Sequence, residues 1–149
     1  MAKFVYRMQN ILNIKEKLET QAKNEFAIAS ANLAREEAAL ETLNRRKDGY
    51  EELLKQLYLD NLDIPKITEA QNAVELLKYQ IKLQQIRVKS AEKELEAARV
   101  KLRDAMVERK THDRLKEREF EQFLADEARA ENKVIDELVS YRFGQKNEE

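Results

Sequence analysis

The chain lacks the residues that most compact domains use to turn and cross-link. Among its 149 residues there is no cysteine and no tryptophan, and Pro65, Gly49 and Gly144 are the only proline and glycines. Without cysteine, neither a disulfide nor a thiolate metal site can form. So few turn residues are typical of long helices rather than of an enzyme that folds around a deep pocket.

Long apolar runs are also absent. Nowhere do 18 apolar residues follow one another, as a membrane-spanning helix requires. The N-terminal MAKFVYRMQNILNIKEKL has no continuous apolar core of the kind found in signal peptides. We therefore expect a soluble, cytoplasmic protein.

Charged residues are plentiful and balanced. They make up 38% of the chain, with 28 Lys and Arg against 29 Asp and Glu, and a formal net charge of -1. A high charged fraction favours solvent-exposed helices or coiled coil. A near-neutral balance argues against binding nucleic acid, which needs a basic face to neutralise phosphates.

Apolar residues recur at steps of three and four along both halves of the chain, the spacing that keeps one stripe of a helix facing a partner helix. In the first half the positions are Phe4, Met8, Ile11, Lys15, Leu18, Ala22, Phe26, Ala29, Leu33, Glu36, Leu40, Leu43, Lys47, Tyr50, Leu54 and Leu57. The step from Ala22 to Phe26 breaks the alternation and predicts a stutter. In the second half they are Val74, Leu77, Ile81, Gln84, Val88, Ala91, Leu95, Ala98, Leu102, Ala105, Phe120, Leu124, Val134, Leu138 and Tyr141.

Between the halves, Asp60-Asn61-Leu62-Asp63-Ile64-Pro65 carries turn-forming residues and a helix breaker. The sequence thus predicts an all-α fold, two long helices in an antiparallel coiled-coil hairpin that forms a single domain over residues 1–149. We place the first helix at about 3–59, the turn at about 60–66, the second helix at about 67–143 and a frayed tail at 144–149.

The two predicted helices are unequal, at roughly 55 and 75 residues, or about 80 and 115 Å. Folding about residue 63 sets Phe4 beside Phe120 and Phe123 and leaves residues from about 124 to 143 without a partner helix. That stretch carries an apolar stripe that we expect another protein to cover. The stripe comprises Phe123, Leu124, Val134, Ile135, Leu138, Val139, Tyr141 and Phe143.

Residues 108–119, ERKTHDRLKERE, interrupt the apolar seam with charge. They form either a solvated face with ion pairs one turn apart or a joint where a partner docks through complementary charge. The apolar residues flanking the turn pose a similar choice between a well-packed tip and an exposed patch that binds another protein. His112 stands alone, so we expect no metal site.

No catalytic constellation is present. There is no glycine-rich phosphate loop and no nucleophile paired with a base, and the carboxylates have no cavity to shift their pKa values. We expect no enzymatic activity and no cofactor.

Two strings of residues resemble the FliJ family, small coiled-coil components of the flagellar type III export apparatus. The opening F-x-Y-R-x-Q-x-I-L-x-I-K-x-x-x-E runs from Phe4 to Glu19, and E-R-K-x-x-x-x-L-K-E-R runs from Glu108 to Arg118, followed by Asp136 to Leu138. Chain length and the two-helix plan match as well.

The resemblance implies a hairpin similar to the central stalk of rotary ATPases. Its open end, where the termini meet, would dock into the export ATPase hexamer and promote ring assembly and ATP hydrolysis. The residues implied at that end are Phe4, Arg7, Ile11, Arg109, Arg118, Phe123, Val134, Leu138 and Tyr141.

The resemblance also implies that the turn end contacts the cytoplasmic domain of the membrane export gate, through Tyr50, Leu77 and Tyr79. Here the chain has Ala73 where some members carry an aromatic residue just after the turn. Export chaperones are further expected partners. The protein would then be monomeric when free and held peripherally at the cytoplasmic face of the cell membrane by the export apparatus.

Two alternatives remain at the level of sequence. One is a nucleic-acid-binding helical arm that uses Arg45, Arg46, Lys47 and Lys55, and the other is a general structural coiled coil that dimerises through its exposed stripes.

Overall fold

Two long helices account for nearly all of the computed structural model, which describes residues 2–148. Helix α1 spans Gln9–Leu59 and helix α2 spans Ile64–Glu148, and the described residues contain no strand. The predicted all-α fold of two long helices that pack against each other is confirmed.

Contacts divide the chain into two compact units. Unit 1 joins the chain up to Glu19 with the chain from Ala105 onward, and unit 2 consists of Thr20–Asp104. Each unit therefore contains a stretch of α1 and a stretch of α2.

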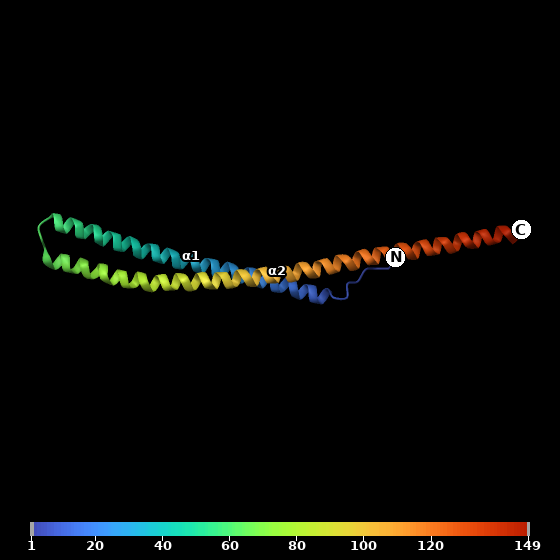
Figure 1. Cartoon of the computed structure of the whole chain (residues 1–149), viewed down its shortest axis with the longest axis horizontal. Coiled ribbons are helices and arrows are strands. Elements are labelled where there is room, and N and C mark those ends of the chain that lie inside the picture. Colours follow the sequence, from blue (N-terminus) through green and yellow to red (C-terminus); the bar gives the residue numbers. More distant parts are fainter. Residues whose placement is uncertain (1, 149) are drawn as a thin grey trace. The chain divides into compact units, whose positions relative to one another are not determined.

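Unit 2 is an antiparallel hairpin, in which α1 and α2 run side by side on either side of a short turn (Figure 1). The turn is shorter than predicted, because α2 begins at Ile64 and not near residue 67. Asp63 caps the helix: its carbonyl accepts a hydrogen bond from the Ile67 amide at 3.0 Å and its carboxylate accepts one from the Lys66 amide at 3.4 Å. Pro65 fits in this first turn, where amides have no partner within the helix.

The seam of unit 2 follows the predicted spacing on α2. The residues from Val74 to Ala91 at steps of three and four are buried, and Leu95, Ala98 and Leu102 are half-buried. Gln84 is the polar member of this seam, 6% exposed, and its amide donates to the backbone carbonyl of Glu36 at 3.0 Å and to the Glu36 carboxylate. A buried polar contact of this kind favours one register of the two helices over others.

Gly49 destabilises α1. It lies in the helix interior, its φ is not positive, and a Cβ built there meets nothing within 4 Å. Alanine is favoured over glycine in such a position by about 1 kcal/mol. We expect Gly49→Ala to raise the midpoint of thermal unfolding, measured by circular dichroism at 222 nm, and an unchanged or lower midpoint would contradict this.

The first helical turns of unit 1 differ from the predicted seam. Met8, Ile11 and Leu18 are 37–46% exposed, whereas Leu12 is 2% and Glu19 5% exposed. With Leu12, Lys15 and Glu19 in the seam, the steps of three and four continue evenly through Ala22 and Phe26. The predicted stutter is therefore wrong: it arose because Leu18 is apolar and its neighbour Glu19 is charged.

The N-terminal residues are not helical, although the sequence predicted a helix from about residue 3. Phe4 is half-buried and Tyr6 is 5% exposed, while Val5 between them is 76% exposed. This alternation is the pattern of an extended chain, in which every second side chain lies on one face. The Tyr6 carbonyl then accepts a hydrogen bond from the Gln9 amide at 3.2 Å, where α1 begins.

The predicted end of the second helix near residue 143 is also wrong. Helix α2 continues through Gly144 to Glu148, and residue 149 of the predicted frayed tail lies outside the described residues. Gly144 does not have the positive φ that would end the helix.

Candidate functional site

Residues 2–8 precede α1, and we call them the N-terminal segment. An aromatic cluster packs this segment against α2 within unit 1. The ring centroid of Phe4 lies 5.2 Å from that of Phe120, edge-on, and 5.5 Å from that of Phe123. These separations are the ones at which aromatic pairs attract. The expected placement of Phe4 beside Phe120 and Phe123 is confirmed.

A polar network lies next along the same helices. Arg109 donates through Nε to the carboxylate of Glu19 and through Nη1 to that of Asp113. Lys15 and Glu108 form a second ion pair between α1 and α2, at 3.4 Å. The hydrogen bond with Glu19, followed by that with Asp113, raises the pKa of the Arg109 guanidinium above its ordinary value, so this group stays positively charged.

This network identifies one role of the charged segment 108–119, which continues the seam in polar form. Arg109, His112, Asp113 and Lys116 are half-buried at the same spacing as the apolar residues before them. Arg109, expected at the ATPase-facing end, is occupied inside unit 1 by two carboxylates. It supports that end of the molecule rather than presenting a free charge.

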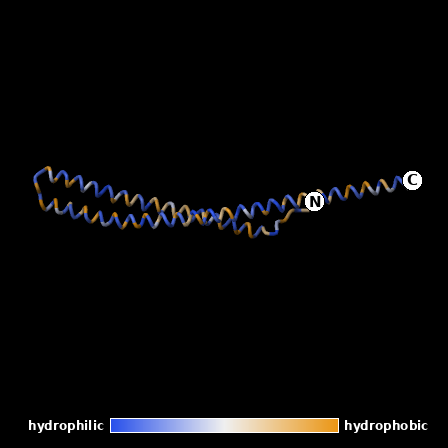
Figure 2. The backbone as a smooth tube through the Cα atoms, viewed as in Figure 1, coloured by the Kyte–Doolittle hydropathy of each residue, from blue (hydrophilic) through white to orange (hydrophobic). Residues whose placement is uncertain are grey.

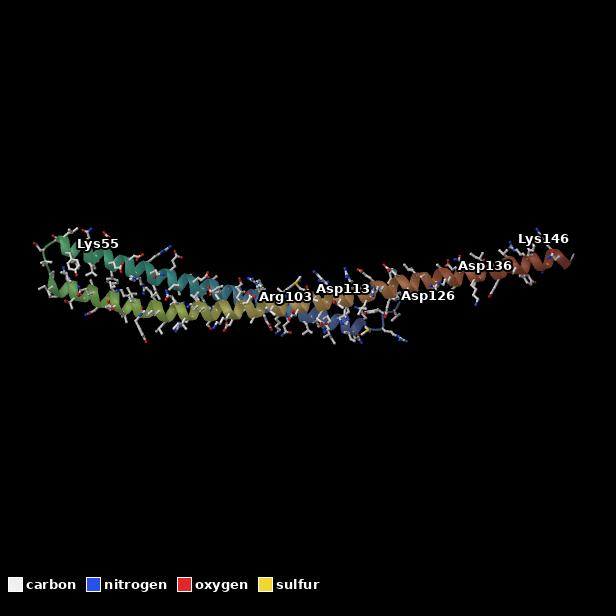
Figure 3. All side chains as sticks on the ribbon, viewed as in Figure 1. Lys55, Arg103, Asp113, Asp126, Asp136 and Lys146 are labelled. Atoms are coloured by element: carbon white, nitrogen blue, oxygen red, sulfur yellow. The ribbon has the colours of Figure 1, made fainter. Side chains whose placement is uncertain are left out.

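Beyond the N-terminal segment, α2 is uncovered. Residues 128–147 are all exposed, and Asp136 and Lys146 lie on a stretch with no other described part of unit 1 beside it (Figure 3). Apolar and polar residues alternate along it (Figure 2). The exposed apolar side chains, each 55–68% accessible, are Val134, Ile135, Leu138, Val139, Tyr141 and Phe143. We call this set the C-terminal stripe.

The other residues expected at this end lie in unit 1 with different exposures. Arg7 and Arg118 are exposed, Ile11 is 38% exposed, and Phe123 is half-buried in the aromatic cluster. A pocket of about 350 Å³ opens beside the cluster. Its lining consists of Phe4, Asp113, Lys116, Glu117 and Phe120.

Unit 2 carries a second candidate surface, a groove of about 310 Å³ between α1 and α2 near the turn. We call it the turn groove, lined by Tyr50, Leu53, Leu57, Lys66, Glu69, Ala70 and Ala73. The small side chains of Ala70 and Ala73 leave its floor open, while Tyr50 and Leu53 are 40% and 45% exposed.

The three residues expected to contact the export gate do not share one surface. Tyr50 lines the turn groove, and Tyr79 is 61% exposed but is not part of the lining. Leu77 is only 6% exposed in the seam, so its expected role as a surface contact does not fit the structure. Its step of three from Val74 places it on the packed face of α2, which is the signal that identifies it as a core residue.

The basic residues proposed for a nucleic-acid arm are partly neutralised by neighbours on α1. Arg45 lies 2.6 Å from the Glu41 carboxylate and Lys47 lies 3.7 Å from that of Glu51. Such pairs one turn apart reduce the local positive potential that phosphates would need.

Within residues 2–148, no three or more His, Cys, Asp or Glu side chains gather in a way that could hold a metal ion. None of the helices over the same range is both long and apolar enough to cross a membrane.

Comparison with known proteins agrees with this architecture. The family model described as Flagellar FliJ protein matches residues 4–148. The structure of a YscO homolog, CT670, from Chlamydia trachomatis superposes with a TM-score of 0.71 at 21% sequence identity, covering 99% of each chain, which shows a shared fold. A search of curated proteins gave no match.

Proposed function

Because the chain belongs to the FliJ family of flagellar proteins, we propose that it is a non-enzymatic component of flagellar protein export that works by binding other proteins. The end of unit 1 docks into the hexamer of the export ATPase and promotes its assembly and ATP hydrolysis. The turn end of unit 2 binds the cytoplasmic domain of the membrane export gate, and the protein also receives export chaperones. These contacts hold it at the cytoplasmic face of the cell membrane.

The C-terminal stripe is the observation that carries the ATPase contact. Six large apolar side chains are more than half exposed on one uninterrupted stretch of helix. A monomeric protein rarely leaves such a stripe in water, because covering it removes apolar surface from solvent at about 25 cal/mol per Å². A helix laid into an apolar groove of a partner is a recurring mode of recognition.

The aromatic cluster and the polar network support this surface. Phe4 and the Glu19–Arg109 pair fix the N-terminal part of the chain against α2 at Phe120 and Arg109, on the N-terminal side of the stripe. Such fixed neighbours reduce the conformational entropy that docking would otherwise remove.

ATP hydrolysis by the cognate export ATPase tests the proposal. We expect the purified chain to raise the rate in a saturable manner and to co-purify with the ATPase. A chain that neither raises the rate of hydrolysis nor co-purifies with the ATPase would contradict the proposed ATPase contact.

The turn groove makes the gate contact testable on its own. We expect Tyr50→Ala to lower recovery of the gate's cytoplasmic domain in a pull-down by about tenfold, since exposed aromatic anchors commonly dominate binding energy. Stimulation of the ATPase should be unaffected.

Tyr58 provides a matched control, because it undergoes the same change on the same helix. It is 53% exposed and does not line the groove, although its hydroxyl accepts a hydrogen bond from Gln71 at 2.8 Å. Equal loss of recovery for Tyr58→Ala would show that the groove is not the contact.

A further inference from the structure

One helix face that includes part of the C-terminal stripe is bounded by charges of opposite sign. Glu131, Ile135, Leu138 and Arg142 follow one another at steps of four, three and four, so they lie on one face of α2. An acidic residue thus stands at one end of this face and a basic residue at the other, with apolar side chains between them.

Pairing two such helices in antiparallel fashion, centred between Asp136 and Glu137, sets Glu131 of each copy opposite Arg142 of the other. The same pairing sets Ile135 opposite Leu138. A parallel pair would instead bring Glu131 against its own copy and Arg142 against its own copy, which like-charge repulsion disfavours. The order of charges therefore favours an antiparallel second copy as occupant.

The length of uncovered helix is also suited to this pairing. Residues 128–147 are exposed, and the N-terminal segment reaches α2 at the start of this stretch, where Ala2 lines a pocket with Leu124, Glu127, Ala128 and Glu131. In the antiparallel pair centred as described, residues 128–145 of each copy, all of them exposed, lie opposite one another. The second copy would thus continue the cover that the N-terminal segment begins.

We propose that the free chain forms an antiparallel homodimer through the C-terminal stripe, with two symmetric Glu131–Arg142 ion pairs. This replaces the monomeric free state expected from the sequence. Each residue of such a two-fold interface contacts the counterpart that contacts it in return. Two helical faces of about 30 Å bury less than about 1,200 Å², the size of weak and reversible contacts.

The dimer covers the same stripe that the proposed function assigns to the ATPase. Provided that assignment holds, self-association competes with docking. Binding of the monomer by the ATPase then shifts the equilibrium from dimer to monomer. Self-association is measured on the purified chain alone. Its failure therefore leaves the ATPase contact untouched, and failure of ATPase stimulation leaves the dimer untouched.

Charge reversal tests the pairing by sedimentation equilibrium over a range of concentrations. E131R sets a guanidinium opposite Arg142 at both symmetric positions, and R142E sets two carboxylates opposite Glu131. Each single change should weaken the dimer by about tenfold, because two attractions become two repulsions. The double variant E131R/R142E restores both pairs and should dimerise within about twofold of the original chain.

K133E is the matched control. Lys133 is exposed and lies with Arg129 and Asp136 on the opposite face of the helix, so its reversal should not change dimerisation. A chain that stays monomeric up to about 500 μM, or a double variant no better than the singles, would overturn the proposal.

Orientation can be measured separately, since the chain has no native cysteine. A spin label on Q145C lies about 25 Å along the helix axis from its copy in the antiparallel pair, at 1.5 Å per residue. In a parallel pair the two labels would lie about 10 Å apart. If pulsed electron paramagnetic resonance finds only the short distance between the two labels, the antiparallel dimer is excluded.

Discussion

Leu138→Asp is expected to abolish stimulation of the cognate ATPase while leaving the protein folded. Leu138 is 57% exposed near the middle of the C-terminal stripe, so the native fold does not depend on its burial. Docking would bury it, and an aspartate there would have to lose its hydration without a compensating partner. We expect at least a tenfold rise in the concentration of chain needed for half-maximal stimulation.

Ser140→Asp is the control that separates position from charge. It introduces the same side chain two residues further on, at an exposed position about 200° around the helix. This variant should stimulate the ATPase as the original chain does. If both variants lose stimulation alike, added negative charge rather than the stripe is responsible, and the proposed docking face is wrong.

The antiparallel two-helix plan was readable from the sequence because spacing and turn chemistry act locally. Apolar residues at steps of three and four specify the packed face of α2 from Val74 to Ala105 without reference to α1. The unequal helix lengths then required Phe4 to meet Phe120, which the structure bears out.

The packed residues at the start of α1 could not be predicted from the spacing of apolar residues. Glu19, and not Leu18, occupies the seam because of Arg109, which lies 90 residues away in the chain and supplies the compensating charge. The extended segment before α1 likewise depends on aromatic partners on α2, and the three consecutive apolar residues Phe4, Val5 and Tyr6 gave no alternation that could indicate it. Burial of a charge is set by its partner, and periodicity contains no information about that partner.

The Glu19–Arg109 pair should control whether residues 9–19, the first turns of α1, stay packed against α2. Glu19 is 5% exposed, so replacing it with arginine sets two guanidinium groups together in a site with little access to water. Asp113 still accepts a hydrogen bond from Arg109, but the two like charges at position 19 and Arg109 repel each other where little water screens them. We expect Glu19→Arg to raise amide hydrogen exchange over residues 9–19 by at least about tenfold, measured by mass spectrometry, with little change near the turn.

The reciprocal exchange distinguishes charge pairing from simple disruption. Glu19→Arg combined with Arg109→Glu restores opposite charges, although Asp113 then faces a carboxylate where it had accepted a hydrogen bond from Arg109. Protection should therefore recover in part in the double variant. Lys17→Glu, an exposed reversal on the same helix, should leave exchange unchanged. No recovery in the double variant would mean that shape at position 19, and not its charge, holds residues 9–19 in place.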